Sequence, residues 1–187
     1  MQAIDKRRKL SARRFADLKK RLGPAGNRYG DMACAYATGS FGRCEASKYS
    51  DLDVFIVGGE TAVEGGPPQR ALSRLDEICL KAKNIAAARE LEFPEFSGDG
   101  AWLTHHTADD LIRRLGTPED DSTNAFTARL LLLLESKPLL GDKIYLGTID
   151  SVITRYWREF ENHKRDFAPG LSGQRHPAAL ADLLREL

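Results

Sequence analysis

The sequence has 187 residues and a mass of 20.8 kDa, which suits one full domain with or without a small helical appendage and excludes two large domains. Its 28 basic and 27 acidic side chains leave a net charge of +1, which excludes a uniformly basic nucleic-acid coat and an acidic disordered tail as the whole protein. Hydrophobic residues make up 42% and charged residues 29%, as in a soluble globular protein.

No targeting or membrane segment is evident. The longest apolar run, at Leu130 to Leu134 with its flanks, falls far short of the ~20 residues that cross a bilayer. The charged N-terminus is not followed by an apolar stretch with a cleavage site. We therefore expect a cytoplasmic protein that does not associate with membranes.

Residues 1–24 are predicted to form a basic amphipathic helix that ends at Gly23-Pro24. Its cationic face has two interpretations. It is either an electrostatic handle for RNA, phosphate or an acidic partner, or a solvated face of a helix that docks through its apolar side. The second is the more common case.

Two short apolar segments, residues 32–38 and 51–57, are predicted to form buried strands, joined by a short helix and a turn. Residues 71–90 should form a helix with one apolar face, composed of Leu72, Leu75, Ile78, Cys79, Ala82 and Ile85. Residues 91–106 combine short extended pieces with a turn.

The remainder of the chain is mostly helical in pattern. Helices are predicted at 108–115, 123–136 and 143–160, followed by an irregular tail at 162–187 with a short helix near its end. Strands thus come early and helices late, which indicates an α+β fold, a small mixed sheet with flanking helices. The expected divisions are 1–24, a core at 25–107, a helical region at 108–161 and the tail.

One group of residues indicates a chemical function. Gly39-Ser40 lies at the end of the first predicted strand and opens a helical stretch, where backbone N–H groups can receive a phosphate. Asp51 and Asp53 begin the second strand, and alternation places their carboxylates on one side and Leu52 on the other. Two carboxylates about 6 to 7 Å apart repel unless a cation lies between them, and Mg²⁺ accepts carboxylate and phosphate oxygens together.

The string from Gly39-Ser40 to Asp51-Leu52-Asp53 resembles the signature of the DNA polymerase β-like nucleotidyltransferase superfamily. Two further segments resemble its bacterial group that includes the nitrogen-signal uridylyltransferases: Arg43-Cys44-Glu45, where that group usually has Arg-Gly-Glu, and Leu134 to Asp142. The resemblance covers residues 36–145. It implies a polymerase β-like core and transfer of a nucleoside monophosphate from a nucleoside triphosphate to an acceptor hydroxyl on a protein, an RNA or a small molecule.

The resemblance also implies site residues. Asp51 and Asp53 would ligate Mg²⁺, with two ions as the usual number, and Gly39, Ser40 and Arg43 would hold the triphosphate. Arg43 has the alternative of an ion pair with Glu45. Cys44 stands where the group usually has glycine. The difference matters because glycine would permit positive φ or a close approach of the ligand.

A third carboxylate is common in the superfamily, and this sequence offers several candidates. Glu92 fits an extended apolar-acid-apolar pattern, Asp99 lies in a glycine-flanked turn, and Glu95 lies between them. His105 and His106 cannot both face one side of a strand, and structural roles are expected for both. Acids at 109–110 and 119–121 are expected to cap helices.

A second function remains open beside the enzyme. The same fold could serve as a catalytically weak or inactive nucleotide-binding module of a regulatory or antitoxin-like kind, because relatives usually add a further domain that completes the pocket. RNA binding through the basic segment Lys6 to Arg21 is a third, weaker hypothesis.

Overall fold

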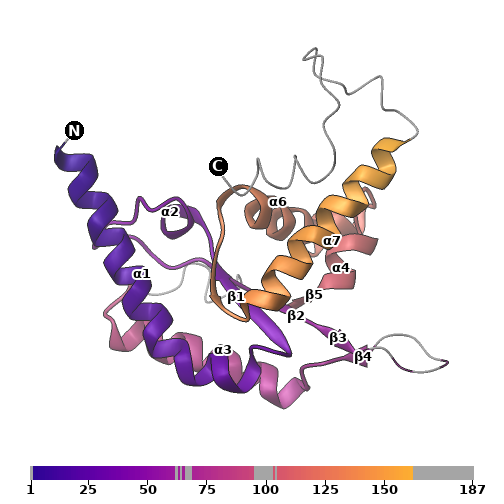
Figure 1. Ribbon diagram of the computed structural model, residues 1–187, viewed down its shortest axis with the longest axis horizontal. Helices are drawn as coiled ribbons and strands as arrows, with labels where there is room; N and C mark the ends of the chain where they lie inside the picture. The colour runs from indigo at the N-terminus through magenta and orange to yellow at the C-terminus, as the bar shows by residue number, and fades with distance from the viewer. Residues whose placement is uncertain are drawn as a thin grey trace, which may run out of the picture.

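The computed structural model describes residues 2–61, 69–94 and 105–161, together with residues 63, 65 and 103 between them. The described residues form a mixed α+β structure, a small sheet flanked by helices (Figure 1). None of the described helices combines the length and the apolarity needed to cross a membrane. The predicted tail at 162–187 lies outside the described residues.

The main sheet has four strands in the order β5-β2-β1-β6. Strands β1 (Ala33–Ala37) and β2 (Val54–Gly58) are antiparallel and confirm that both predicted strands exist, but β2 begins three residues later than predicted, after Asp51 and Asp53, and ends one residue later. Strand β6 (Lys137–Leu140) pairs antiparallel with β1, and β5 (His105–Thr107) pairs parallel with β2. A small separate hairpin is formed by β3 (Glu60–Thr61) and β4 (Gln69–Arg70).

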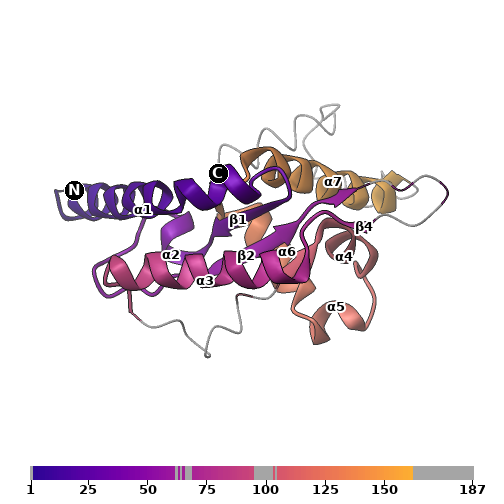
Figure 2. The same cartoon turned by 90° about the horizontal axis from the view of Figure 1, so that it is seen from below.

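Helices cover both faces of the sheet (Figures 1 and 2). On one face lie α1 (Gln2–Tyr29) and α3 (Arg74–Glu90), which share an apolar core with Ala35, Val54 and Ile56. On the other lie α4 (Ala108–Arg113), α6 (Ala125–Glu135) and α7 (Asp142–Glu161), which pack on Tyr36 and Phe55. Because β1 and β2 are covered on both sides, all ten of their residues are buried.

Helix α1 does not end at Gly23-Pro24, and the predicted boundary at residue 24 was wrong. The helix continues to Tyr29 because Leu18, Leu22, Ala25 and Tyr29 form a single buried face, each at most 2% exposed. Packing of this face against the sheet outweighs the loss of one backbone hydrogen bond at the proline.

Helix α3 ends where predicted but begins at Arg74 rather than at residue 71, and its packing differs from the expected one. Of its predicted apolar face, Leu75 is 75% and Ile78 52% exposed, whereas the helix buries Glu77, Leu80 and Asn84. Its first turn is capped by Ser73, which accepts a hydrogen bond from the Asp76 amide. A count of apolar residues cannot locate this face, since Glu77 and Asn84 are buried through polar partners.

Strand β6 was missed by the sequence reasoning, which placed the strands early and the helices late. It lies between α6 and α7, at the edge of the sheet beside β1. An edge strand tolerates Pro138, which has no amide hydrogen for the ladder. Gly141, at a φ of 72°, then turns the chain against the backbone of Ala33, where a side chain would collide.

Candidate functional site

The predicted glycine turn and the second aspartate lie against each other. The Thr38 amide, after β1, donates to the Asp53 carbonyl at 3.0 Å, and the short helix α2 (Gly39–Gly42) follows. Gly39 has a φ of 60°, and a Cβ at this position would lie 2.9 Å from Oδ2 of Asp53. Glycine is therefore needed both for the backbone conformation and for the approach of the carboxylate.

Leu52 separates the two aspartates and faces the opposite side of the sheet. It is 2% exposed and belongs to the core formed with α1 and α3, whereas Asp51 and Asp53 are only half-buried. Both aspartates precede the first residue of β2, but the Asp53 carbonyl already pairs with the neighbouring chain. Alternation of extended backbone predicts that the two acids, unlike Leu52, face the side of the sheet covered by α6 and α7.

The Asp53 carboxyl lies in an acidic environment. Its pKa is raised, first by burial and then by the negative charges of Asp51 and Glu135. Among the described residues, no arginine, lysine or histidine forms an ion pair with Asp51 or Asp53. The described part of the chain thus brings the charge of Asp51 to bear on Asp53 without supplying a positive charge that would offset the two acids.

Glu135, at the end of α6, is a part of this neighbourhood that the sequence reasoning missed as a site residue. It forms an ion pair with Arg43, and a side chain at Gly42 would collide with the Glu135 carbonyl. In the sequence, Glu135 is marked only by its place in the Leu134 to Asp142 segment, which carries the resemblance but indicates no role for this acid. The close backbone approach at Gly42 brings this acid to the α2 turn.

Arg43 forms two ion pairs in the structure. Its Nε donates to Glu45 at 3.0 Å, which is the alternative that the sequence left open, and a second nitrogen contacts Glu135. The side chain is nonetheless 46% exposed. A guanidinium at this position can still turn toward a phosphate, since surface ion pairs of this kind contribute little stability.

Cys44 occupies the left-handed region with a φ of 59°. A left-handed conformation favours glycine, and here a cysteine adopts it. The half-buried thiol accepts a hydrogen bond from the Lys137 ammonium of β6. The contact ties the α2 loop to the edge strand.

The third carboxylate is not found on a described strand. Glu92 is exposed and has a φ of 53° in the turn that ends α3, so its predicted extended conformation was wrong. Glu95 and Asp99 lie outside the described residues. Within 2–61, 69–94 and 105–161, no group of three or more histidine, cysteine or acidic side chains is arranged to hold a metal ion.

Ser40 is half-exposed in the first turn of α2. Its carbonyl accepts the Glu45 amide at 2.7 Å, which closes the loop after the helix. In the part of the chain that the structure describes, its hydroxyl has no hydrogen-bond partner. The side chain is therefore available to a ligand beside Gly39 and Asp53.

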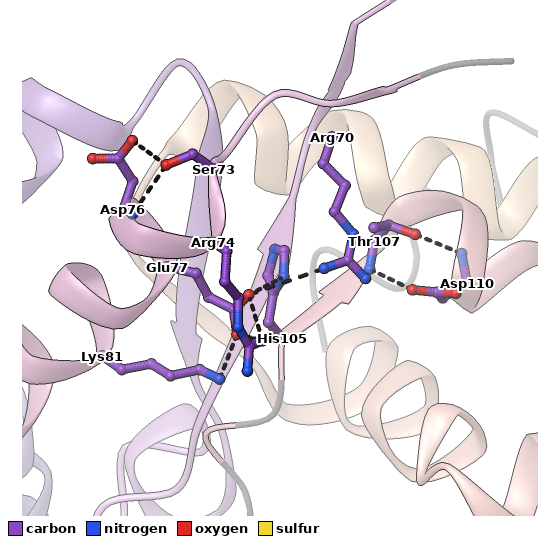
Figure 3. A network of polar contacts seen from close by, with 9 residues as sticks. All are labelled: Arg70, Ser73, Arg74, Asp76, Glu77, Lys81, His105, Thr107 and Asp110. Atoms are coloured by element: carbon purple, nitrogen blue, oxygen red, sulfur yellow. Dashed lines mark hydrogen bonds and ion pairs between the residues drawn. The ribbon is translucent and has the colours of Figure 1, made fainter.

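A second polar cluster surrounds Glu77 on the opposite face of the sheet (Figure 3). Glu77 is 2% exposed, and its oxygens lie 2.6 Å from Lys81, 3.2 Å from Arg74 and 3.3 Å from Nδ1 of His105. Arg70 of β4 reaches the same carboxylate at 4.0 Å. Burial alone would raise the pKa of Glu77, but the Lys81 hydrogen bond and the surrounding positive charges lower it. The cluster fastens α3, β4 and β5 together.

The two adjacent histidines point to opposite faces of β5. His105 contacts Glu77 below the sheet, while His106 packs beside Phe55 on the other face, with ring centroids 6.4 Å apart. Burial lowers the pKa of His106 to about 4. The prediction that both cannot face one cleft is confirmed.

The acids that open the helices have two different roles. Asp110 completes a capping box with Thr107 at the start of α4, as predicted. Asp120 in the short α5 (Glu119–Ser122) is instead buried in an ion pair with Arg129 of α6, which corrects its expected role as a cap. An open pocket of about 540 Å³ between α4 and α5 includes none of the predicted site residues; its lining is Asp109, Asp110, Arg113, Arg114, Thr117, Pro118 and Glu119.

Comparison with protein-family models, with curated proteins and with solved structures finds no match to this chain.

Proposed function

We propose that this chain is a Mg²⁺-dependent nucleotidyltransferase with a polymerase β-like core, which moves a nucleoside monophosphate from a nucleoside triphosphate to an acceptor hydroxyl. The observation that carries the proposal is the pair Asp51 and Asp53 beside Gly39. Alternation predicts that the two acids share one side of the chain, neither has a basic partner among the described residues, and the pKa of Asp53 is raised by burial and then by neighbouring acids.

The donor set fits a hard divalent cation. Asp51 and Asp53 supply carboxylate oxygens, and a bound triphosphate would add the oxygens that Mg²⁺ prefers as further ligands. When bound, Mg²⁺ would offset the charge of the phosphates and of the acceptor oxygen. The chain's own part is to fix both carboxylates through the buried Leu52 and to leave the Ser40 hydroxyl and the amides beside it open to phosphate.

The wider fold is consistent with the proposal. A short helix follows the first strand, the acidic pair precedes the antiparallel second strand, and helices cover both faces. A polymerase β-like site needs this succession of strand, glycine turn and acid-bearing strand. Arg43 would turn from Glu45 and Glu135 toward the phosphates when these arrive.

The test is calorimetric titration of each nucleoside triphosphate with Mg²⁺ into the wild type, Asp51→Asn/Asp53→Asn and the surface control Asp31→Asn. We expect Mg²⁺-dependent binding by the wild type and the control, and its loss in the double variant. Equal binding by all three proteins would count against the metal role of the two acids.

A nucleotide-binding module without efficient catalysis is the second candidate. It is favoured by one observation: besides Asp51, the acid whose charge acts on Asp53 is Glu135, and Arg43 already forms an ion pair with it, so it is poorly placed to accept a proton. Release of pyrophosphate over a panel of acceptors separates the two candidates. Turnover that vanishes without Mg²⁺ would exclude the binding-only module.

A further inference from the structure

The outer face of α1 carries a row of four cations, Lys6, Lys9, Arg13 and Lys20, which we name the basic stripe. At 3.6 residues per turn these positions fall within about 60° of arc. They lie opposite the buried face that begins at Leu18, and all four are exposed. The stripe therefore points away from the body of the protein.

The remaining cations of α1 from Arg14 onward are bound to the rest of the chain. Their contacts are Arg14 to the Ser47 carbonyl at 3.0 Å, Lys19 to Asp142 at 3.3 Å, Arg21 to Glu90 at 3.2 Å and Arg28 to Asp76 at 3.7 Å. The four members of the stripe have no ion pair with any residue in the ranges that the structure describes. Arg7 and Arg8, outside the stripe, also have no ion pair among the described residues, so cations that fasten the helix and cations that face outward are separated only from Arg13 onward.

The arrangement of the stripe opposes the stability of the helix. Lys6 and Lys9, three residues apart, and Lys9 and Arg13, four apart, are neighbours of like charge, and each such pair costs about 0.2–0.5 kcal/mol. Cations in the first turns also oppose the helix dipole. Asp5, four residues before Lys9, and Asp17, four after Arg13 and three before Lys20, offset part of this repulsion. A bound polyanion would remove the remainder, and we infer a ligand with several negative charges in a row.

We propose that the basic stripe binds the phosphate backbone of single-stranded RNA and that this RNA is the acceptor of the transferred nucleotide. The second part rests on the proposed function. From Lys6 to Lys20 the stripe extends about 21 Å along the helix axis, long enough to follow several phosphates of one strand. RNA combines such a row of phosphates with the hydroxyls that the transfer needs at a chain end.

The location of α1 connects the stripe to the candidate site. Helix α1 lies beside α2, and the Arg14 guanidinium lies 6.0 Å from the centre of the Phe41 ring within that short helix (Figure 1). A strand held on α1 is therefore held by the element that also supports the Gly39 turn.

The experiment measures binding of a short fluorescein-labelled oligouridylate by fluorescence anisotropy at several salt concentrations. If Lys6, Lys9 and Arg13 each neutralise one phosphate, they contribute about −2 to the slope of log affinity against log salt concentration. These three contacts then lower the affinity about 20-fold between about 50 and about 200 mM salt. The variant Lys6→Ala/Lys9→Ala/Arg13→Ala should lose this part of the slope. Alanine favours the helix, and circular dichroism checks that the variant is folded.

A matched variant, Lys83→Ala/Arg113→Ala/Lys143→Ala, removes three exposed cations from other helices and the same net charge. It should bind like the wild type. Absent binding, salt-insensitive binding or an equal loss in both variants would overturn the proposal. Equal competition by polyglutamate would also overturn it, because the stripe would then recognise acidic protein.

The acceptor role has its own readout, the transfer of a radiolabelled nucleoside monophosphate to the same oligonucleotide. Label on RNA that falls with the stripe variant supports the acceptor role, and label only on another acceptor overturns it. If no acceptor is labelled but stripe-dependent binding persists, the proposed function fails while the RNA-binding surface stands. The two failures are therefore distinguishable.

Discussion

Replacing Asp53 by asparagine should stabilise the protein when no metal is present. In the folded state the Asp53 carboxylate is partly buried and lies near the negative charges of Asp51 and Glu135, which together raise its pKa. A raised pKa means that the folded state holds the proton more tightly than the unfolded state. Stability is therefore highest below the unfolded pKa of the group and falls as the pH rises through the folded pKa.

The size of the effect follows from the spacing of the two acids. Side chains at i and i+2 of an extended chain lie about 6.5 Å apart, where two unit charges repel by about 0.6 kcal/mol in bulk water and about 2.6 kcal/mol at an effective dielectric constant of about 20. Because Asp53 is half-exposed, we expect a value near the lower end. The asparagine variant should gain about 1 kcal/mol in the free energy of unfolding at neutral pH.

The assay is urea unfolding at low ionic strength, with a chelator and with millimolar Mg²⁺. Mg²⁺ should raise the stability of the wild type by preferential binding to the folded state and leave the variant nearly unchanged. Asp31→Asn, an exposed aspartate outside the site, is the control and should show neither effect. The reasoning is refuted if Asp53→Asn is less stable than the wild type in the chelator, or if Mg²⁺ stabilises both equally.

Three further changes have definite expected outcomes. Gly39→Ala should lose nucleotide binding and about 1–2 kcal/mol of stability, because its Cβ would meet Asp53; Gly116→Ala, with the same sign of φ but open space, should lose stability alone, and equal binding by both would contradict the contact. The His106 imidazole has a pKa lowered by burial to about 4 and therefore binds its proton more weakly than in the unfolded chain, so the free energy of unfolding falls as the pH drops from about 6.5. The variant His106→Phe should reduce the loss of stability between pH 7 and pH 4 by about 3 kcal/mol, as measured by denaturant unfolding at each pH. Glu77→Gln should lower the free energy of unfolding by about 2 kcal/mol, and a value near zero in urea unfolding would contradict its role as a fastening.

The parts of the fold that could be predicted are those encoded by neighbouring residues. The apolar runs around Ala35 and Ile56 predict buried strands, and alternation alone places Leu52 opposite Asp51 and Asp53. The glycine at position 39 indicated a tight turn, and the structure adds that its missing side chain makes room for a carboxylate. These features need no knowledge of distant contacts.

The parts that could not be predicted depend on partners far away in the sequence. Helix α3 buries Glu77 rather than Ile78, because the Arg70 guanidinium and the His105 imidazole of other strands lie against its carboxylate. Strand β6 forms because one edge of β1 is open to it. Its proline is compatible with an edge strand but not with a central one. In the site, Glu135 reaches the α2 turn through packing of α6 that no local pattern shows.

Asp53 and Glu77 lie in opposite electrostatic environments, and this contrast bears on function. Around Glu77 the fold gathers Lys81, two arginines and a histidine, and the pKa of the acid is lowered. Around Asp53 it gathers two acids, and the pKa is raised although exposed basic side chains are abundant elsewhere on the surface. The same neutralising substitution is therefore expected to weaken the protein at Glu77 and to strengthen it at Asp53. Among the described residues, cations surround Glu77 and none pairs with Asp53, and this is the pattern expected where stability is given up for binding.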